Sequence, residues 1–332
     1  MNPSESPLIS VALATYNGEK YLAEMLDSIE NQDYPHVEIV IADDASTDAT
    51  PHILRARCGR FPCTVLEDGR RLGVIGNFSR AIAACHGDYI AFADQDDVWR
   101  ADKLSRLLER MRTIEQARGS DFPALVFSDL ALVDERLTPL AASFFTHAKK
   151  STRCAGLADF FVSNHVPGCA MLVNRALIQR AMPVPQAFHM HDWWFIMVAA
   201  AFGEIAYIDA PLIQYRQHSA NTVGVHQNRH SLRTRLRNAC RWESWKRFLL
   251  PPADRIQWTR QNIALFENRY RHTLPQHARK TLAALRACAR NWWPCVQFLA
   301  RAKTGESLAF SFFTLRAIAP IDPPAKELVS QE

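Results

Sequence analysis

No uninterrupted apolar stretch in this chain of 332 residues approaches the roughly 20 residues that a membrane-spanning helix needs. The first residues, Met1 to Pro7, also lack the basic and hydrophobic segments of a secretion signal. The eight cysteines include no Cys-x-x-Cys pair, and several lie in apolar surroundings typical of buried free thiols. We therefore expect a cytoplasmic protein, because a reducing compartment is the simpler interpretation of such cysteines.

Internal repeats and low-complexity segments are absent as well. With 48% hydrophobic and 22% charged residues, the chain can form one elaborate α/β domain, or a domain with an appendage. Its net charge of +5 is unevenly distributed, because acidic residues predominate over residues 1–225 and basic residues over residues 226–332. A basic C-terminal region indicates an anionic partner, such as phospholipid, nucleic acid or a phosphorylated acceptor.

Apolar runs alternate with segments of helical spacing through the first part of the chain. This rhythm predicts right-handed β-α-β crossovers and a mostly parallel, Rossmann-like sheet with helices on both faces. The predicted strands are residues 8–14, 37–42, 63–66, 89–93 and 124–128. The predicted helices are residues 19–31, about 47–57, 77–85 and 101–118.

Beyond residue 128 this alternation breaks down, and the pattern changes again near residue 226. The middle part predicts a hairpin over 129–138, strands over 169–173, 205–208 and 212–215, and a helix over 195–202. The last part predicts a basic amphipathic helix over 231–250 and helices over 255–270 and 276–302. We expect a body, residues 1–225, and a helical C-terminal region, residues 226–332, that packs on the body or lies on a membrane surface.

An acidic cluster directly follows the most apolar of the predicted strands. Asp94, Asp96 and Asp97 come at the end of the run Tyr89 to Ala93. Ligands of open α/β sheets bind beyond the carboxyl ends of the strands, and crowded carboxylates favour a divalent cation such as Mg²⁺ or Mn²⁺. The alternative is an acidic N-cap for the helix that starts near Ala101.

Three stretches together resemble family 2 glycosyltransferases of the GT-A fold: SVALATYNG at 10–18, DDASTD at 43–48 and GDYIAFADQDDVW at 87–99. The later motifs HDWW, at 191–194, and YRQH, at 215–218, resemble the branch that assembles rhamnose-containing polysaccharides. The resemblance covers residues 8–225 and implies a nucleotide-binding half over about 8–128 and an acceptor half over about 129–225. The C-terminal region lies outside it.

The resemblance implies roles for the residues at the first two strand ends. Asp44, with Asp43 beside it, would hydrogen-bond the nucleobase of a nucleotide-sugar donor, and Thr15 and Tyr16 would border base and ribose. A capping turn made by Asp43 and Ser46 is the alternative.

The resemblance also makes Asp94 and Asp96 the metal-binding pair, with Asp94 close to the nucleotide. Their Mn²⁺ or Mg²⁺ would bridge the diphosphate and neutralise charge on the leaving nucleotide. His218 is a candidate for a further ligand, and a purely structural histidine is the alternative.

An inverting sugar transfer needs a general base beside the acceptor hydroxyl, and Asp192 matches the position of the family's base. Capping of the helix that follows would also place an aspartate there. Trp193 and Trp194 offer stacking or packing surfaces beside it, and His191 precedes it. Gly168 would allow a close backbone approach on the acceptor side, and a strand-entry turn is the alternative explanation of this glycine.

The motifs thus predict an inverting, metal-dependent glycosyltransferase that uses a dTDP- or UDP-sugar, with dTDP-rhamnose as the leading donor. Its acceptor would be a hydroxyl of a growing polysaccharide or lipid-linked glycan. Residues 226–332 would contact anionic membrane peripherally, since bulky apolar residues among the arginines argue against nucleic acid. Two alternatives are a haloacid-dehalogenase-type phosphohydrolase, with Asp94 as nucleophile and Asp96 as acid/base, and a catalytically silent binding protein.

Overall fold

The computed structural model describes residues 6–56, 59–154, 156–161, 164–219 and 253–290. The chain divides into two compact units. The first, which we call the body, comprises Met1–Thr152, Val166–Gln186 and Met190–Gly224. The second, the C-terminal unit, comprises Arg153–His165, Ala187–His189 and Val225–Glu332. The helix expected over residues 231–250 lies outside the described residues.

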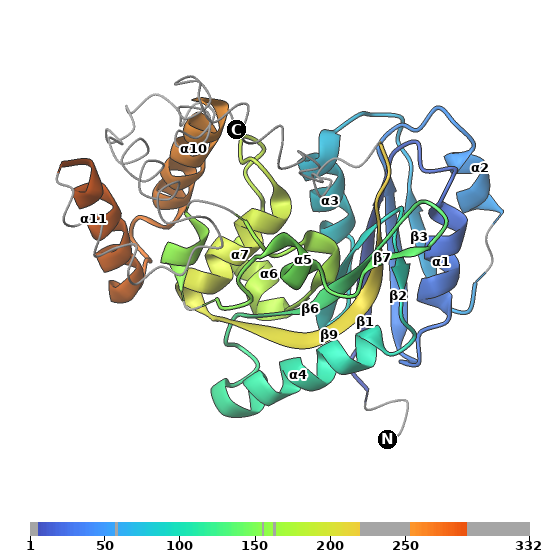
Figure 1. Cartoon of the computed structure of the whole chain (residues 1–332), viewed down its shortest axis with the longest axis horizontal. Helices are drawn as coiled ribbons and strands as arrows, with labels where there is room; N and C mark the ends of the chain where they lie inside the picture. The colour runs from blue at the N-terminus through green and yellow to red at the C-terminus, as the bar shows by residue number, and fades with distance from the viewer. Residues whose placement is uncertain (1–5, 57–58, 155, 162–163, 220–252, 291–332) are drawn as a thin grey trace, which may run out of the picture. The chain divides into compact units, whose positions relative to one another are not determined.

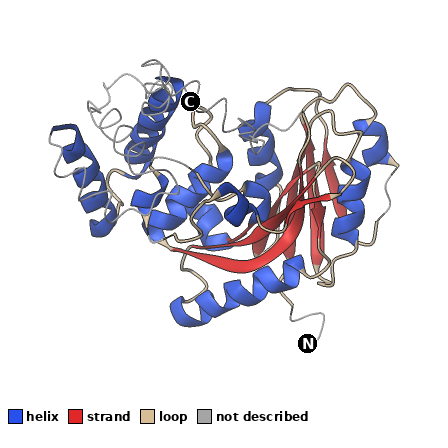
Figure 2. Cartoon of the chain, in the orientation of Figure 1, coloured by secondary structure: helices blue, strands red, loops and turns tan. Residues whose placement is uncertain are grey.

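In the described part of the body, nine strands form one sheet in the order β3-β2-β1-β4-β8-β6-β9-β5, with β7 paired to β6. The strands are β1 (Ile9–Thr15), β2 (Val37–Asp43), β3 (Cys63–Leu66), β4 (Tyr89–Asp94), β5 (Val98–Trp99), β6 (Ala124–Val133), β7 (Pro139–Ala141), β8 (Met171–Asn174) and β9 (Glu204–Arg216). Figure 2 shows this curved sheet with helices on either side.

The first four strands are parallel, as the alternating pattern predicts. Their cores are almost continuous apolar runs, because helices cover both faces of a parallel sheet. The register places Thr15 of β1 opposite Asp43 of β2, and Ala14 opposite Asp94 of β4. The acidic ends of β2 and β4 therefore lie at one edge of the sheet, on either side of the end of β1.

The remaining strands make the sheet mixed. Strand β8 lies antiparallel between β4 and β6, and β9 runs parallel to β6 but antiparallel to β5. The expectation of two strands over 205–208 and 212–215 was wrong, because they form the single strand β9. Its pairing with β6 shifts register where Asp129 meets Pro211, and this irregularity accommodates a proline inside the strand. Strands β6 and β7 form the hairpin predicted near residues 129–138.

Helices α3, α6 and α7 lie against one face of the sheet, and α1 and α4 against the other (Figure 1). The body's helices are α1 (Leu22–Glu30), α2 (Thr50–Arg55), α3 (Gly73–Ala83), α4 (Lys103–Arg118), α5 (Phe144–Ala148), α6 (Arg175–Ala181), α7 (His191–Phe202) and the 3₁₀ helix η3 (Gly168–Ala170). Helix α7 begins four residues earlier than the expected 195–202, so His191 and Asp192 lie in its first turn. It is apolar on nearly every side and is accordingly buried.

The C-terminal unit contains η2 (Leu157–Phe160), α10 (Ala253–Tyr270) and α11 (Gln276–Arg290). The two long helices lie where the spacing predicts helices over 255–270 and from residue 276. Their buried apolar residues are Ile263, Phe266 and Tyr270 on α10 and Ala278, Leu282 and Leu285 on α11. Among the described helices, none is both long and apolar enough to cross a membrane.

Candidate active site

Asp43 is held by its own turn at the end of β2. Its carboxylate accepts hydrogen bonds from the Ser46 amide, at 2.9 Å, and from the Ser46 and Thr15 hydroxyls, at 2.5 and 2.9 Å. Asp43 and Thr15 are buried. Asp43 and Ser46 thus make the capping turn that the sequence offered as the alternative. The neighbouring Asp44 instead contacts the loop that follows β3.

Asp44 contacts the beginning of α3. Its two oxygens accept hydrogen bonds from the backbone amides of Leu72, at 2.5 Å, and Gly73, at 3.0 Å. The Arg71 guanidinium lies 3.6 Å from the centroid of the Tyr16 ring and donates to its hydroxyl. Asp44 and Tyr16, both predicted to face the nucleotide, therefore adjoin one loop that carries a cationic side chain.

The acidic loop after β4 is closed onto the end of β1 by Gln95. The Gln95 side chain accepts from the Tyr16 amide, at 2.8 Å, and donates to the Tyr16 carbonyl, at 2.9 Å. Gly18 lies against the same side chain, which a Cβ atom at that position would strike. The turn after β1 and the Asp94–Asp97 loop are consequently fixed to each other.

The half-buried Asp94 and the buried Asp97 and Cys169 form a group in which the ligand atoms all lie within 4.8 Å of one another. Burial, reinforced by the charges of Asp96 and Asp192, raises the pKa of Asp94 to about 7. Burial and the neighbouring Asp96 and Asp94 charges also raise the pKa of Asp97 well above its usual value. Removing these charges from water is costly, so the group favours a cation.

Lys103 supplies an amine beside this group. Its side chain is fully buried, and Nζ donates to the Cys169 carbonyl at 2.8 Å and lies 3.1 Å from the centroid of the Trp99 ring. Burial lowers the pKa of this amine well below its usual value, although the Asp97 and Asp94 charges oppose the shift. The amine therefore compensates the carboxylates only in part.

Asp96 lies on the other side of the loop and faces the end of β9. His218 Nε2 lies 2.8 Å from Asp96 Oδ2, and the His218 ring packs 4.9 Å from that of Tyr21. Arg216 is buried; its side chain donates to the Asp96 carbonyl at 2.8 Å, and its backbone amide donates to Asp97 Oδ1 at 3.1 Å. The structure thus brings His218 to one of the two carboxylates predicted to bind metal.

Asp192 begins α7 and lies against Gly168 of η3. A Cβ atom on Gly168 would come within 3.2 Å of Asp192 Cβ and 3.5 Å of His191 Nε2. His191 is buried and stacks on Phe78, with 3.8 Å between ring centroids. Because the Asp192 charge contributes to the pKa shift of Asp94, the carboxylate predicted as base lies near the carboxylate predicted as metal ligand.

The two tryptophans after Asp192 take the packing role. Trp194 is fully buried, and its indole Nε1 donates to the Ala181 carbonyl at 2.7 Å. Trp193 is 7% exposed. Trp194 therefore offers no exposed ring face to a sugar in this structure, and its effect on the site is to fix α7 against α6.

A hard cation fits this donor set through its carboxylates. Asp94, Asp96 and Asp97 offer oxygen ligands, which Mg²⁺ and Mn²⁺ prefer. The Cys169 thiol is a poor ligand for such ions, because burial and the nearby carboxylates raise its pKa well above the usual value and keep it protonated.

The comparisons with known proteins agree with this arrangement. Residues 10–118, which carry the turn after β1, the end of β2 and the whole acidic loop, match the model of "Glycosyl transferase family 2". Over these residues the chain is similar to glycosyltransferase family 2. The haloacid-dehalogenase alternative finds no support in this match.

Two relatives extend the likeness beyond the matched segment. The chain is 29% identical over 227 residues to the dTDP-rhamnosyl transferase RfbG of Shigella flexneri, covering 64% of this chain and 74% of RfbG. It is 34% identical over 173 residues to TuaG of Bacillus subtilis, a glycosyltransferase named for teichuronic acid biosynthesis, covering 51% of this chain and 63% of TuaG. The matches thus span about three fifths to three quarters of these relatives.

A solved structure bears on the fold alone. TarS residues 1–349 of S. aureus superpose with a TM-score of 0.50 at 17% sequence identity, over 94% of this chain and 90% of that one. The expected GT-A fold is thereby confirmed.

Several residues of this candidate site were not predicted from the sequence. They surround the predicted ones and are Arg71, Asn77, Gln95, Lys103, Cys169 and Arg216. A signal existed for two of them, because Gln95 lies inside the acidic motif and Arg216 inside the YRQH motif. Lys103 and Cys169 carried none, since only the fold brings them to the acidic loop.

Proposed function

We propose that this chain transfers a sugar, with inversion, from a nucleotide-diphosphate donor to a hydroxyl of a growing polysaccharide or lipid-linked glycan. The observation that carries the proposal is that Asp192, in the first turn of α7, lies close enough to Asp94 for its charge to act on that carboxylate. In such a transfer the acceptor oxygen bonds to the anomeric carbon, the bond to the diphosphate breaks, and the acceptor proton passes to a base.

Asp192 is the proposed base. It lies beside Gly168, where a Cβ atom would come within 3.6 Å of Asp192 Oδ2, so the glycine keeps residue 168 from crowding the carboxylate that is to bind an acceptor hydroxyl. His191 and Trp193 border it on the same helix, and we propose that they help to shape the acceptor side. Asp192 thus binds and orients the attacking hydroxyl and takes its proton.

Asp94 and Asp96, with His218 behind Asp96, are the proposed holders of Mn²⁺ or Mg²⁺. When bound, the cation neutralises charge that develops on the diphosphate. Thr15, Tyr16, Asp43 and Asp44 border the proposed nucleotide site, with Asp44 as the group for the base. Arg71, stacked on Tyr16, adds a cation that suits a phosphate-bearing donor.

The donor we propose is dTDP-rhamnose. The support is the similarity to RfbG, whose name states that it is a dTDP-rhamnosyl transferase, together with the HDWW and YRQH motifs. The similarity to TuaG supports a cell-envelope polysaccharide as the acceptor class. We further propose that the enzyme works at the inner face of the cytoplasmic membrane, where residues 226–332 contact anionic lipid.

Calorimetric titration with dTDP, UDP and GDP, each with and without Mn²⁺, tests the nucleotide site. We expect metal-dependent binding of dTDP, and we expect Asp96→Ala to remove the Mn²⁺ dependence. Asp192→Asn should lower the rate of transfer by roughly a thousandfold while dTDP binding stays unchanged, since a general base contributes about 10²–10⁴. Asp121→Asn, on an exposed turn, is the matched control. Folded protein that binds none of the nucleotides would overturn the proposal.

A further inference from the structure

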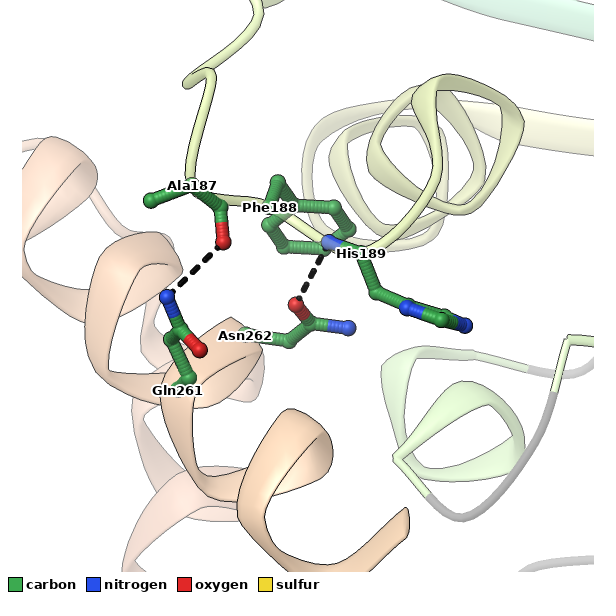
Figure 3. Close-up of a pocket in the computed structure, with 5 residues that line it drawn as sticks. All are labelled: Ala187, Phe188, His189, Gln261 and Asn262. Carbon is green, nitrogen blue, oxygen red and sulfur yellow. Dashed lines mark hydrogen bonds between the residues drawn. The ribbon is translucent and has the colours of Figure 1, made fainter. Parts of the chain in front are cut away.

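The C-terminal unit contains a pocket whose residues are not part of the site described above. It is lined by Ala187, Phe188 and His189, from the segment before α7, and by Gln261 and Asn262 of α10 (Figure 3). We call it the 187–262 pocket. Its volume is about 200 Å³, below the roughly 300–1,000 Å³ of sites for drug-sized ligands. The size suits one sugar ring.

Two hydrogen bonds build the pocket wall. Gln261 Nε2 donates to the Ala187 carbonyl at 2.9 Å, and the His189 amide donates to Asn262 Oδ1 at 3.0 Å (Figure 3). Both bonds satisfy backbone groups of residues 187–189, so α10 fixes the course of this segment. The pocket is therefore preformed, which reduces the ordering cost of binding a ligand.

Asn262 leaves one strong donor unused. Its side chain is 1% exposed, its oxygen is occupied by His189, and its Nδ2 has no hydrogen-bond partner among the residues that the structure describes. A buried amide donor without a partner has lost its hydrogen bonds to water and regained none, which is unfavourable. A ligand oxygen that accepts from Nδ2 would remove this cost.

The lining is uncharged, and this selects the class of ligand. Burial lowers the pKa of His189 below its usual value, which favours the neutral ring at pH 7. Phosphate and carboxylate ligands need cationic partners such as arginine or lysine, and the five lining residues include neither. A neutral hydroxyl-bearing group meets the amide donor without leaving an unpaired charge.

The chain connects this pocket to the proposed base. Only two residues separate His189 from Asp192, so their Cα atoms lie at most about 11 Å apart. We propose that the 187–262 pocket binds a neutral sugar unit of the acceptor glycan, with Asn262 Nδ2 donating to one of its hydroxyls. The proposal rests on the proposed transferase function, for which it names an acceptor subsite.

Saturation-transfer NMR on the full chain tests the subsite with three probes: methyl α-L-rhamnopyranoside, methyl β-D-glucopyranoside and methyl β-D-galactopyranoside. Asn262→Asp keeps the oxygen that accepts from His189 and removes the donor. We expect a saturation-transfer signal for at least one glycoside with the wild type. With Asn262→Asp we expect that signal to be at least fivefold weaker. Asn268→Asp, the same change at an exposed position of α10, should bind like the wild type.

A second measurement on the unmodified chain does not depend on how well the variant folds. The bound glycoside should shift the side-chain amide resonances of Asn262, and inorganic phosphate should not. Absence of transfer from folded wild type, equal transfer in Asn262→Asp, or a shift caused by phosphate would each overturn the subsite. Nucleotide titration remains separate, because loss of dTDP binding in the wild type counts against the transferase proposal.

Discussion

His191 is a neutral imidazole in an apolar cage. Phe78 and Phe92 flank its ring, and both ring nitrogens are without hydrogen-bond partners among the described residues. Burial lowers its pKa to about 3. The helix that carries the proposed base therefore begins with a polar residue that the fold holds uncharged.

This burial makes stability depend on pH. Above pH 6.5 the ring is neutral in the folded and the unfolded chain and contributes no pH dependence. Below pH 6.5 only the unfolded chain takes up the proton, so the free energy of unfolding falls until the folded pKa of about 3 is reached. From pH 7 to pH 5 the contribution of His191 is a loss of about 2 kcal/mol, at about 1.4 kcal/mol for each unit below 6.5, and the raised pKa of Asp94 acts in the opposite direction.

We expect His191→Phe to remove this loss, because the substituted ring stacks on Phe78 but does not titrate. The measurement is urea unfolding at pH 7 and at pH 5. For each protein, the free energy of unfolding at pH 5 is subtracted from that at pH 7. His52→Phe, an exposed position on α2, should retain the loss. If His191→Phe shows the same pH dependence as the wild type, the ring is not held neutral in the fold.

At the scale of single residues, the sequence predicted which residues form the site better than it predicted their burial and contacts. The acidic motif placed Asp94, Asp96 and Asp97 at a strand end, where the structure has them. It did not predict that Lys103 would be fully buried beside them, or that Asp43 would be occupied by its own turn. Burial depends on neighbours from β8, η3 and β9, and those neighbours are distant in the chain.

At the scale of elements, the side chain of Asn174 connects β8, β6, α4 and α6. Asn174 ends β8 and caps α6 by accepting from the Leu177 amide at 3.1 Å. The same oxygen accepts from the Ala124 amide of β6 at 3.0 Å, and Nδ2 donates to the Phe122 carbonyl at 2.9 Å and to Glu115 of α4 at 3.1 Å. One amide side chain therefore connects the end of β8 to β6, α4 and α6, in addition to the backbone pairing of β8 with β4 and β6.

Asn174→Ala should lower the free energy of unfolding by about 3 kcal/mol, because it leaves a buried backbone amide and a helix cap without partners. Urea unfolding at neutral pH measures the change. Asn31→Ala, at an exposed helix end without a side-chain cap, should cost less than about 0.5 kcal/mol. A loss below about 1 kcal/mol for Asn174→Ala would mean that water or nearby groups replace its bonds.

Elements with an apolar pattern of their own were predicted from the sequence, and elements that depend on a partner strand were not. The β-α-β part was predictable because each strand and helix carries its own apolar period. Strand β5 has only two residues, Val98 and Trp99, and exists because β9 pairs with it. The sequence around Pro211 predicted a break between two strands. In the structure β9 continues through Pro211, because its register with β6 shifts opposite Asp129. Such features arise from the partner strand and leave no local pattern.

In the whole molecule, the change of composition near residue 226 falls close to the boundary between the two units. No pattern in the sequence indicated, however, that Arg153–His165 and Ala187–His189 would join the C-terminal unit. Cutting the chain near residue 226 would therefore strip these segments of their partners. Charge reversal is the cleaner test of membrane contact.

Ile263 and Phe266 of α10 and Leu282 and Leu285 of α11 are buried, and the ion pair between Arg286 and Glu267, at 2.8 Å, connects the two helices. The exposed residues include Arg269, Arg271 and Lys280. If this surface meets a membrane, we expect the attraction to be electrostatic and sensitive to salt, because these exposed residues are cationic.

We expect the combined variant Arg269→Glu, Arg271→Glu and Lys280→Glu to bind vesicles containing phosphatidylglycerol about a hundredfold more weakly than the wild type. Each basic residue near an anionic surface contributes about 1 kcal/mol. The measurement is co-sedimentation at two salt concentrations, with phosphatidylcholine vesicles as the neutral surface. Arg118→Glu, Arg136→Glu and Lys149→Glu, combined on the body, form the matched control. Equal binding by the two triple variants would show that the C-terminal unit does not direct the protein to the membrane.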